Sequence, residues 1–191
     1  MAHTFRSLKL AETKTVNAAT VQVRDVILPE DLDDVKRLWM EYLTWGNNTM
    51  QAMYGVHPHD PKEAVEQDIE SIDKFRPPYG RLMLAVHEGK VCGLGSLKSI
   101  NPETGEIKRM YVDPGTRRIG AGRAILKALI VEAKDAGYKT VRLDSPKFMK
   151  AAHSLYRSFG FKDIEAYPEM EIPQEFKEYL LFMELKLSQC I

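Results

Sequence analysis

Glycines and arginines come together at the predicted start of a helix, in the segment EIKRMYVDPGTRRIGAGRAIL (residues 106–126). A strand pattern ends there in an Asp-Pro-Gly turn, and an apolar helical period begins near Gly120. Glycine lets a backbone approach a ligand closely, and the first helical turn presents unpaired N–H groups with a partial positive charge. Arg117, Arg118 and Arg123 add full positive charges around this point. The combination predicts a binding site for a diphosphate.

Two common phosphate motifs do not fit this segment. A dinucleotide-binding fingerprint requires a third glycine at position 125, where the chain has Ile125. A P-loop requires Gly-Lys followed by Ser or Thr, which the sequence does not contain. A Gly-x-Gly pair before a helix also occurs in ordinary helix-initiating turns, but the two preceding arginines favour the phosphate interpretation.

The composition favours one globular domain of ordinary size. The chain has 191 residues, and its 27 basic and 27 acidic side chains cancel. This balance argues against binding nucleic acid through bulk phosphate neutralisation. A chain of this length can fold without disulfides or a metal, and Cys92 and Cys190 are interpreted as reduced thiols. We expect residues 1–19 to form a weakly ordered extension and residues 20–191 to form a single domain.

Membrane and targeting signals are not evident in the sequence. No segment approaches the roughly 20 apolar residues that a membrane-spanning helix needs. The first segment, MAHTFRSLKLAETK, does not have the apolar run of a secretory signal. The sequence therefore predicts a cytoplasmic protein with no membrane or nucleic-acid partner.

Hydrophobic periodicity predicts an α+β fold. Strand patterns cover residues 20–27, 81–89, 90–100, 106–112, 139–144, 161–167 and 178–187. Helix patterns cover residues 32–43, 61–75, 120–137 and 148–160, and residues 45–61 are expected to be irregular. Short turns join the strands between residues 81 and 112, so these strands must be antiparallel. The later alternation of strand and helix predicts a mixed sheet with helices on both faces.

The glycine–arginine loop also resembles a known family. The run Arg117-Arg118-Ile119-Gly120-Ala121-Gly122 resembles the Q/R-x-x-G-x-G/A signature of the GCN5-related N-acetyltransferases (GNAT). The resemblance covers residues 20–187 and implies a mixed, mostly antiparallel sheet flanked by helices on both faces. It also implies that this loop, with Arg123, binds the pyrophosphate of acetyl-CoA. In the family the preceding strand splays from its neighbour at a bulge and pairs with the pantetheine arm. By resemblance, that part of the strand is Met110, Tyr111 and Val112.

A second segment, AAHSLYRSFGF (residues 151–161), is similar to the family's A-x-x-LY-x-x-x-GF motif. The resemblance implies that Tyr156 acts as a general acid and protonates the departing coenzyme A. The alternative is that Tyr156 is a core residue, since it shares a helix face with Ala152 and Phe159. Many family members have a coenzyme-contacting asparagine seven residues before the tyrosine, where this chain has Met149.

Two carboxylates are candidates for the base that acetyl transfer to an amine requires. An alkyl ammonium has a pKa of about 10, so a base, or a water chain ending in one, must remove a proton. By resemblance, Glu106 matches a glutamate of histone-type members, and Asp144 lies where some ribosomal-protein members have one. Alternatively, Glu106 is a solvated charge at a strand start and Asp144 belongs to a turn. We take Glu106 as the first candidate and keep Asp144 and a water chain open.

The resemblance implies an acyltransferase that uses acetyl-CoA as co-substrate and no metal. It would move the acetyl group directly to an amine in a ternary complex, since no cysteine lies near the motifs to carry an acyl group. Two alternatives stay open: an enzyme that transfers another acyl group from CoA, and a non-catalytic module that binds or senses acyl-CoA.

The acceptor is less well defined by the sequence. Four acidic residues lie between the last two strands, and they would suit a cationic amine: Glu165, Glu169, Glu171 and Glu175. The alternative is a charged, solvated loop. Polyamines, amino acids, antibiotics and protein N-termini all remain open as acceptors. By resemblance, exposed sheet edges make a homodimer one option.

Overall fold

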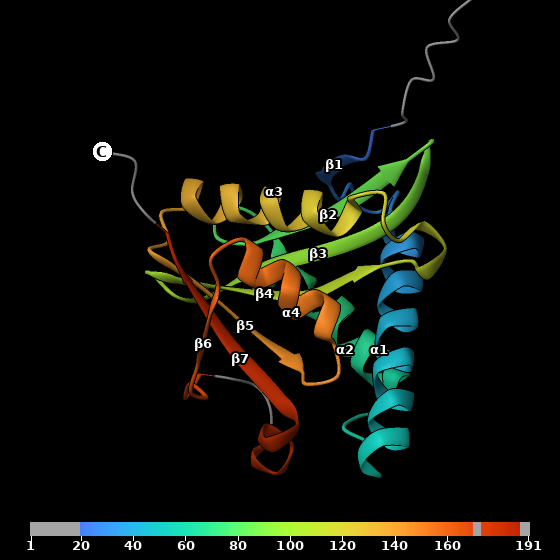
Figure 1. Cartoon of the computed structure of the whole chain (residues 1–191). Coiled ribbons are helices and arrows are strands. Elements are labelled where there is room, and N and C mark those ends of the chain that lie inside the picture. Colours follow the sequence, from blue (N-terminus) through green and yellow to red (C-terminus); the bar gives the residue numbers. More distant parts are fainter. Residues whose placement is uncertain (1–19, 170–172, 188–191) are drawn as a thin grey trace, which may run out of the picture.

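A computed structural model describes residues 20–169 and 173–187, whose strands form one seven-stranded sheet in the order β1-β2-β3-β4-β5-β7-β6 (Figure 1). The strands are β1 Gln22–Asp25, β2 Arg81–His87, β3 Lys90–Asn101, β4 Thr104–Val112, β5 Thr140–Pro146, β6 Lys162–Ile164 and β7 Leu180–Lys186. The helices are α1 Leu32–Tyr54, α2 Pro61–Glu70, α3 Ala121–Asp135 and α4 Lys150–Ser158. Short 3-10 helices span Ile72–Phe75, Pro114–Thr116 and Gln174–Tyr179.

The strand pairing confirms the predicted α+β fold and its antiparallel meander. β2 pairs with β3 and β3 pairs with β4 in antiparallel fashion, and β4 with β5 is the parallel pair. β7 is inserted between β5 and β6 and is antiparallel to both. The sheet is therefore mixed and mostly antiparallel. β1 and β6 are its edge strands, and the homodimer expected from such edges stays a prediction.

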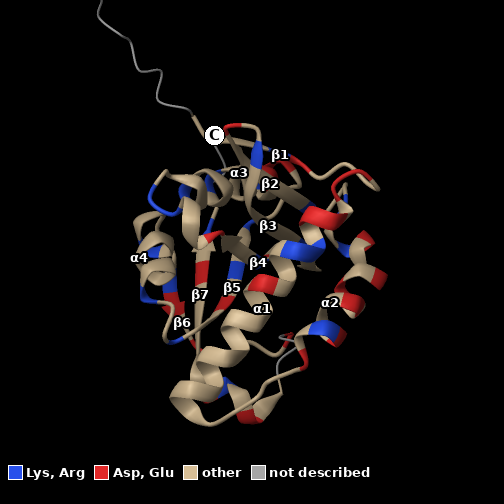
Figure 2. Cartoon of the chain, turned by 90° about the vertical axis from the view of Figure 1, so that its right-hand side faces the viewer, with Lys and Arg blue, Asp and Glu red and all other residues tan. Residues whose placement is uncertain are grey.

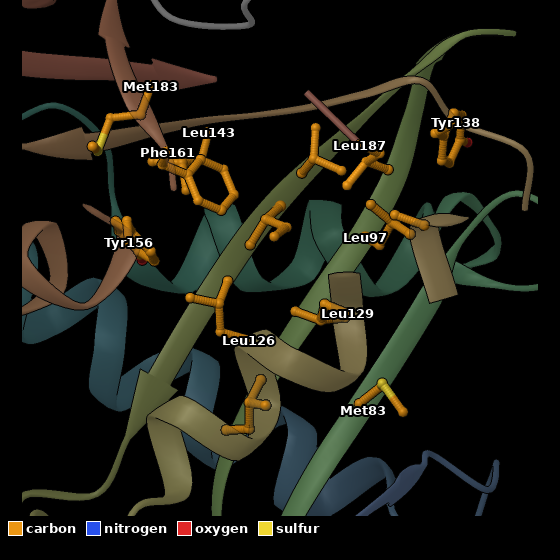
Figure 3. Close-up of a cluster of buried hydrophobic side chains, with 14 of the residues drawn as sticks. Met83, Leu97, Leu126, Leu129, Tyr138, Leu143, Tyr156, Phe161, Met183 and Leu187 are labelled. Carbon is orange, nitrogen blue, oxygen red and sulfur yellow. The ribbon is translucent and has the colours of Figure 1, made fainter. Parts of the chain in front are cut away.

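Helices cover both faces of the sheet, and each face has its own core. Ile125 and Leu129 of α3 pack with Met83 of β2 on one face (Figure 3). Trp39 of α1 packs with Leu84 of β2 on the opposite face. Neighbouring residues of β2 thus point to opposite sides, as the alternation of a pleated strand requires.

Helix α1 is longer than the sequence predicts. The prediction of an irregular segment over 45–61 is wrong for residues 45–54, which are helical. The helix continues to Tyr54 and ends at Gly55, which has a left-handed φ of 73°. Asn47 and Met50 extend the buried stripe of the first turns. Burial of this stripe outweighs the low helix propensity of the Gly46-Asn47-Asn48-Thr49 run.

The pairing between β4 and β5 ends early, which opens the sheet at its centre. The parallel ladder stops at Glu106 opposite Arg142, although β4 continues to Val112. The register between β3 and β4 also shifts near Arg109, whose φ is 54°. A bulge of this kind bends a strand and redirects its side chains. The splay and the bulge that the family resemblance implies are therefore both present.

Parts of the predicted organisation lie outside the described residues. These are the expected extension over 1–19 and the last residues, including Cys190. Within 20–169 and 173–187, no helix is both long enough and apolar enough to cross a membrane.

Candidate active site

The loop before α3 has the geometry of an anion site. Arg118 and Gly120 both have left-handed φ angles, 71° and 91°, and Gly120 caps the helix. Such a turn directs successive backbone N–H groups to one side. The first hydrogen bond of the helix is donated by the Ala124 N–H to the Gly120 carbonyl. The N–H groups of the first turn, from Ala121 on, are therefore available to a ligand.

The arginines around this loop differ in their contacts. Arg123 donates from Nη2 to Ser158 Oγ at 3.0 Å, which turns it toward the end of α4. Arg117 lies over the ring of Trp45, 5.8 Å from its centroid. Arg118 is exposed and makes no hydrogen bond or ion pair within the described part of the chain. Ile119, between the arginine and the glycine, is also exposed.

A small cavity of about 40 Å³ lies where β4 separates from β5. Met110 lines it from β4, Asp144 from β5 and Tyr156 from α4. Beyond Glu106, the side of β4 that faces β5 has no strand partner. The small cavity therefore lies beside free backbone groups and next to a tyrosine hydroxyl.

Tyr156 is 6% exposed, and burial raises the pKa of its hydroxyl well above the ordinary value. Its ring packs against Phe161, with the centroids 5.9 Å apart. The residue is therefore part of the core and also borders the cavity, so the two interpretations of its role are compatible.

A second cavity of about 480 Å³ adjoins the first. The two share five lining residues: Tyr42, Lys108, Arg109, Asp144 and Met149. Figure 2 shows β4 and β5 between α4 on one side and α1 with α2 on the other. Helices α1 and α2 and strands β4 and β5 supply most of the lining of the large cavity. Among residues 20–169 and 173–187, no three or more metal-ligating side chains form a cluster.

The two candidate bases lie in different environments. Asp144 lines both cavities and its side chain is 16% exposed. Glu106 is fully buried and lines neither cavity, so its interpretation as a solvated strand-start charge is wrong. Its Oε1 accepts a hydrogen bond of 2.7 Å from the Tyr167 hydroxyl. Its Oε2 lies 3.3 Å from Lys98 Nζ and 3.6 Å from Lys108 Nζ.

Lys108 links the two carboxylates, because its Nζ also lies 3.5 Å from Asp144 Oδ2. Burial, together with the Glu106 carboxylate, raises the pKa of the Tyr167 hydroxyl, so Tyr167 acts only as a donor to Glu106 at neutral pH. Sequence reasoning missed both residues. The signal for Lys108 was a Lys-Arg pair within an otherwise buried strand, whereas no local pattern marks Tyr167.

The segment between the last strands borders the large cavity through Pro173 and Phe176, but its described acidic residues do not line it. Glu165, Glu169 and Glu175 are absent from its lining, and Glu169 lies 3.7 Å from Arg142. Glu171 is outside the described residues. The cationic acceptor expected from this segment therefore gains no support from the geometry.

Comparisons with known proteins agree with this architecture. The sequence profile of the Acetyltransferase (GNAT) family matches residues 33–161. An uncharacterised N-acetyltransferase of Schizosaccharomyces pombe is 30% identical over 176 residues, which cover 90% of this chain and 98% of the relative.

Solved structures share the fold. A GCN5-related N-acetyltransferase of Kribbella flavida matches with a TM-score of 0.67 at 23% identity, over 88% of this chain and 98% of that one. The yncA protein of Salmonella typhimurium, solved with acetyl-CoA, matches with a TM-score of 0.61 at 19% identity, over 90% and 96% of the two chains.

Proposed function

The chain belongs to the GNAT acetyltransferase family, and from that premise we propose that it transfers the acetyl group of acetyl-CoA directly to an amine. One observation carries the proposal: Asp144 lines both cavities at the point where β4 leaves β5. The small cavity, which Tyr156 borders, would hold the thioester. The large cavity would hold the acceptor, with a carboxylate between the two.

The residues proposed to hold acetyl-CoA fit its chemistry. The free edge of β4 at Met110, Tyr111 and Val112 offers backbone groups to the amide-bearing pantetheine arm. The N–H groups at the start of α3 offer donors to the pyrophosphate, and Arg117, Arg118 and Arg123 surround them with positive charge. The small cavity holds about three water-sized atoms, which suits an acetyl group better than a bulkier acyl chain.

Asp144 is the residue we assign as the base. An ammonium must lose a proton before its nitrogen can attack the thioester carbon. Asp144 can accept that proton directly or through a water molecule, because it faces the acceptor cavity. Lys108 contacts the Asp144 carboxylate and holds it in position. Glu106 contacts the same ammonium group and holds Lys108 in place. Glu106 is thus a positioning residue in this proposal.

Tyr156 is assigned as the acid. As the C–N bond forms and the C–S bond breaks, the thiolate of CoA accepts the hydroxyl proton. A thiol has a pKa of about 8.5, below that of the buried tyrosine, so the proton moves to sulfur only in concert with the return of a proton to the tyrosine oxygen. That returning proton is the second one that the attacking nitrogen must lose to become an amide, and Asp144 releases the first proton to solvent.

The raised pKa of Tyr156 leads to a prediction for the pH profile. Because burial raises this pKa, the hydroxyl keeps its proton above pH 10 and kcat should show no descending limb up to that pH. Tyr156→Phe should lower kcat about 100-fold at every pH, whereas Tyr79→Phe, at an exposed tyrosine, should not. A descending limb near pH 8–9 that disappears in Tyr156→Phe would show instead that the tyrosine titrates low.

Product analysis tests the proposed activity itself. The protein is incubated with acetyl-CoA carrying a ¹³C-labelled acetyl group and a panel of primary amines, and the products are identified by mass spectrometry. The proposal requires a labelled amide and an equal amount of free CoA. Tight acetyl-CoA binding without any amide would favour a non-catalytic acyl-CoA module. Faster turnover of propionyl- or succinyl-CoA would favour another acyl donor.

A further inference from the structure

More basic than acidic side chains of the described residues line the acceptor cavity. Among residues 20–169 and 173–187, its charged side chains are Asp68, Lys74, Lys108, Arg109 and Asp144. His59 also lines the cavity, but burial lowers the pKa of its imidazole, which therefore adds no charge at neutral pH. Lys108 lies between Asp144 and the buried Glu106, so its charge is compensated. The other two cations, Lys74 and Arg109, share the single carboxylate of Asp68.

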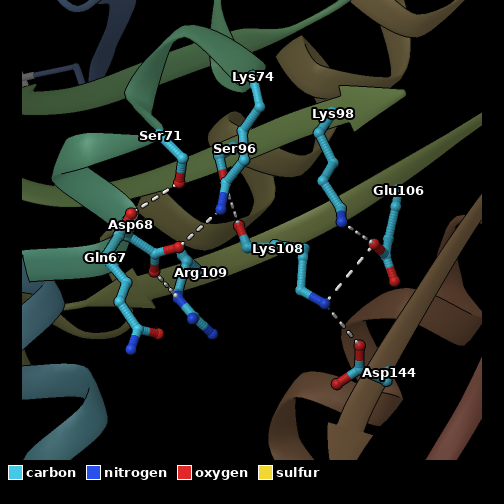
Figure 4. Close-up of polar contacts among 10 residues, drawn as sticks. All are labelled: Gln67, Asp68, Ser71, Lys74, Ser96, Lys98, Glu106, Lys108, Arg109 and Asp144. Atoms are coloured by element: carbon cyan, nitrogen blue, oxygen red, sulfur yellow. Dashed lines mark hydrogen bonds and ion pairs between the residues drawn. The ribbon is translucent and has the colours of Figure 1, made fainter. Parts of the chain in front are cut away.

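The excess positive charge lies around Asp68, at the α2 side of the cavity. The Asp68 carboxylate is 7% exposed and binds two cations at once. Lys74 Nζ lies 3.0 Å from Oδ1, and Arg109 Nε lies 2.6 Å from Oδ2 (Figure 4). One carboxylate cannot neutralise both cations, so an anionic group of a ligand would bind favourably beside them.

Arg109 presents the part of its guanidinium that is suited to such an anion. It uses Nε for Asp68, and its two terminal nitrogens lie on the side away from that carboxylate (Figure 4). Within 20–169 and 173–187, neither terminal nitrogen donates a hydrogen bond. A guanidinium with two free parallel donors matches a carboxylate in a bidentate pair.

The backbone at Arg109 supports a functional role for this side chain. Its φ of 54° is uncommon for a residue other than glycine, and it occurs inside the bulge of β4. Strain of this kind is retained mainly where the surrounding structure and the site require it. The bulge brings Arg109 to the wall that both cavities share.

We propose that the acceptor is an amino acid, whose carboxylate binds Arg109 and Lys74 while its amine faces Asp144. The inference rests on the proposed acetyl transfer and names its substrate class. The cavity's other lining residues include Leu43, Met50 and Phe176, so it also has an apolar wall for a nonpolar side chain. A cationic polyamine would meet the excess positive charge, and a protein N-terminus would bring an amide where the carboxylate should be.

Matched amines test the proposal. L-phenylalanine is compared with L-phenylalaninamide and phenylethylamine, which keep the amine and the ring but not the carboxylate. One comparator is less basic and the other more basic than the amino acid, so amine basicity alone cannot produce the same trend in both. We expect kcat/KM for phenylalanine to exceed both values by about 50-fold, the effect of a charge-assisted pair.

Variants identify the residue responsible. Arg109→Gln should raise KM for phenylalanine and reduce its advantage over phenylethylamine to near one, and Arg109→Lys should restore part of it. Arg76→Gln, at an exposed arginine that pairs with Asp73, should leave the preference intact. Lys74→Met removes the positive charge of the other cation beside Asp68, independently of Arg109. Calorimetry should show that all four variants still bind acetyl-CoA, which also shows that they are folded.

Two results would overturn the inference. Equal or better turnover of the amines without a carboxylate would refute it and leave the acetyl-transfer proposal standing. Equal losses for phenylalanine and phenylethylamine in Arg109→Gln would show a structural role for the arginine instead. If no amine of any class yields an amide, the proposed function itself fails, and the inference fails with it.

Discussion

Replacing Gly120 with glutamate is expected to abolish acetyl-CoA binding, with a loss of at least about 100-fold, or about 2.7 kcal/mol. Two effects act together. Gly120 has a φ of 91°, which a residue with a Cβ adopts at a cost. The new carboxylate would also lie at the start of α3, where we place the diphosphate, so like charges would repel. Isothermal titration with acetyl-CoA, without an acceptor, measures the loss.

Gly137 provides a matched control at the other end of the same helix. Its φ is 87°, and a Cβ there would meet no atom within 4 Å, as is also true of Gly120. Gly137→Glu therefore introduces the same charge and the same kind of backbone strain away from the site. We expect similar losses of thermal stability in both variants, but a change of acetyl-CoA affinity only in Gly120→Glu. Equal weakening by both would show that the effect acts through the fold and not through the loop.

Replacing Asp144 with asparagine is expected to lower kcat between about 100-fold and 1,000-fold at neutral pH, the contribution of a general base. Binding of acetyl-CoA should change little, because Asp144 borders only the thioester and belongs neither to the loop before α3 nor to the free edge of β4, which make most of the proposed contacts. The activity of the variant should rise with pH toward the amine pKa of about 10, since only the free amine then reacts. Wild type should depend on pH much less over that range.

Glu106→Gln separates the two carboxylates. Removing a buried charge that lies between Lys98 and Lys108 leaves both ammonium groups with less compensation, which costs about 3–5 kcal/mol of stability. We therefore expect a clear fall in melting temperature, and a smaller fall in kcat than for Asp144→Asn. The reverse order of the two kcat values would make Glu106 the base, as the sequence first suggested. Asp163→Asn, at a half-exposed ion pair with Arg157, serves as the surface control.

The glycine turn before α3 was predictable because its requirements are local, whereas phosphate binding there stays a prediction. Gly120 must adopt a positive φ, and the first turn of α3 follows it directly in the sequence. The order of strands and helices was predictable for the same reason, since alternation and periodicity are read over short windows. The early end assigned to α1 was wrong because Gly46 and its neighbours are poor helix formers locally, and only packing against other elements keeps them helical.

The choice between Glu106 and Asp144 could not be made from the sequence. It depends on where the β4–β5 ladder ends, which places Glu106 within the paired part of the sheet and Asp144 beside the opening. The role proposed for Arg109 depends on a bulge and on Asp68, which is 41 residues away in the chain. Such long-range contacts leave no periodic signal. The insertion of β7 between β5 and β6 is of the same kind.

A single-turnover experiment tests direct acetyl transfer more directly than any other measurement. The protein is mixed in excess over labelled acetyl-CoA, quenched at short times, and analysed for free CoA, acetylated protein and acetylated amine. We expect neither free CoA nor acetylated protein before an acceptor is added, and then CoA and amide at equal rates. Release of CoA with acetylated protein before acceptor is added would contradict the account, because it would show a covalent enzyme intermediate.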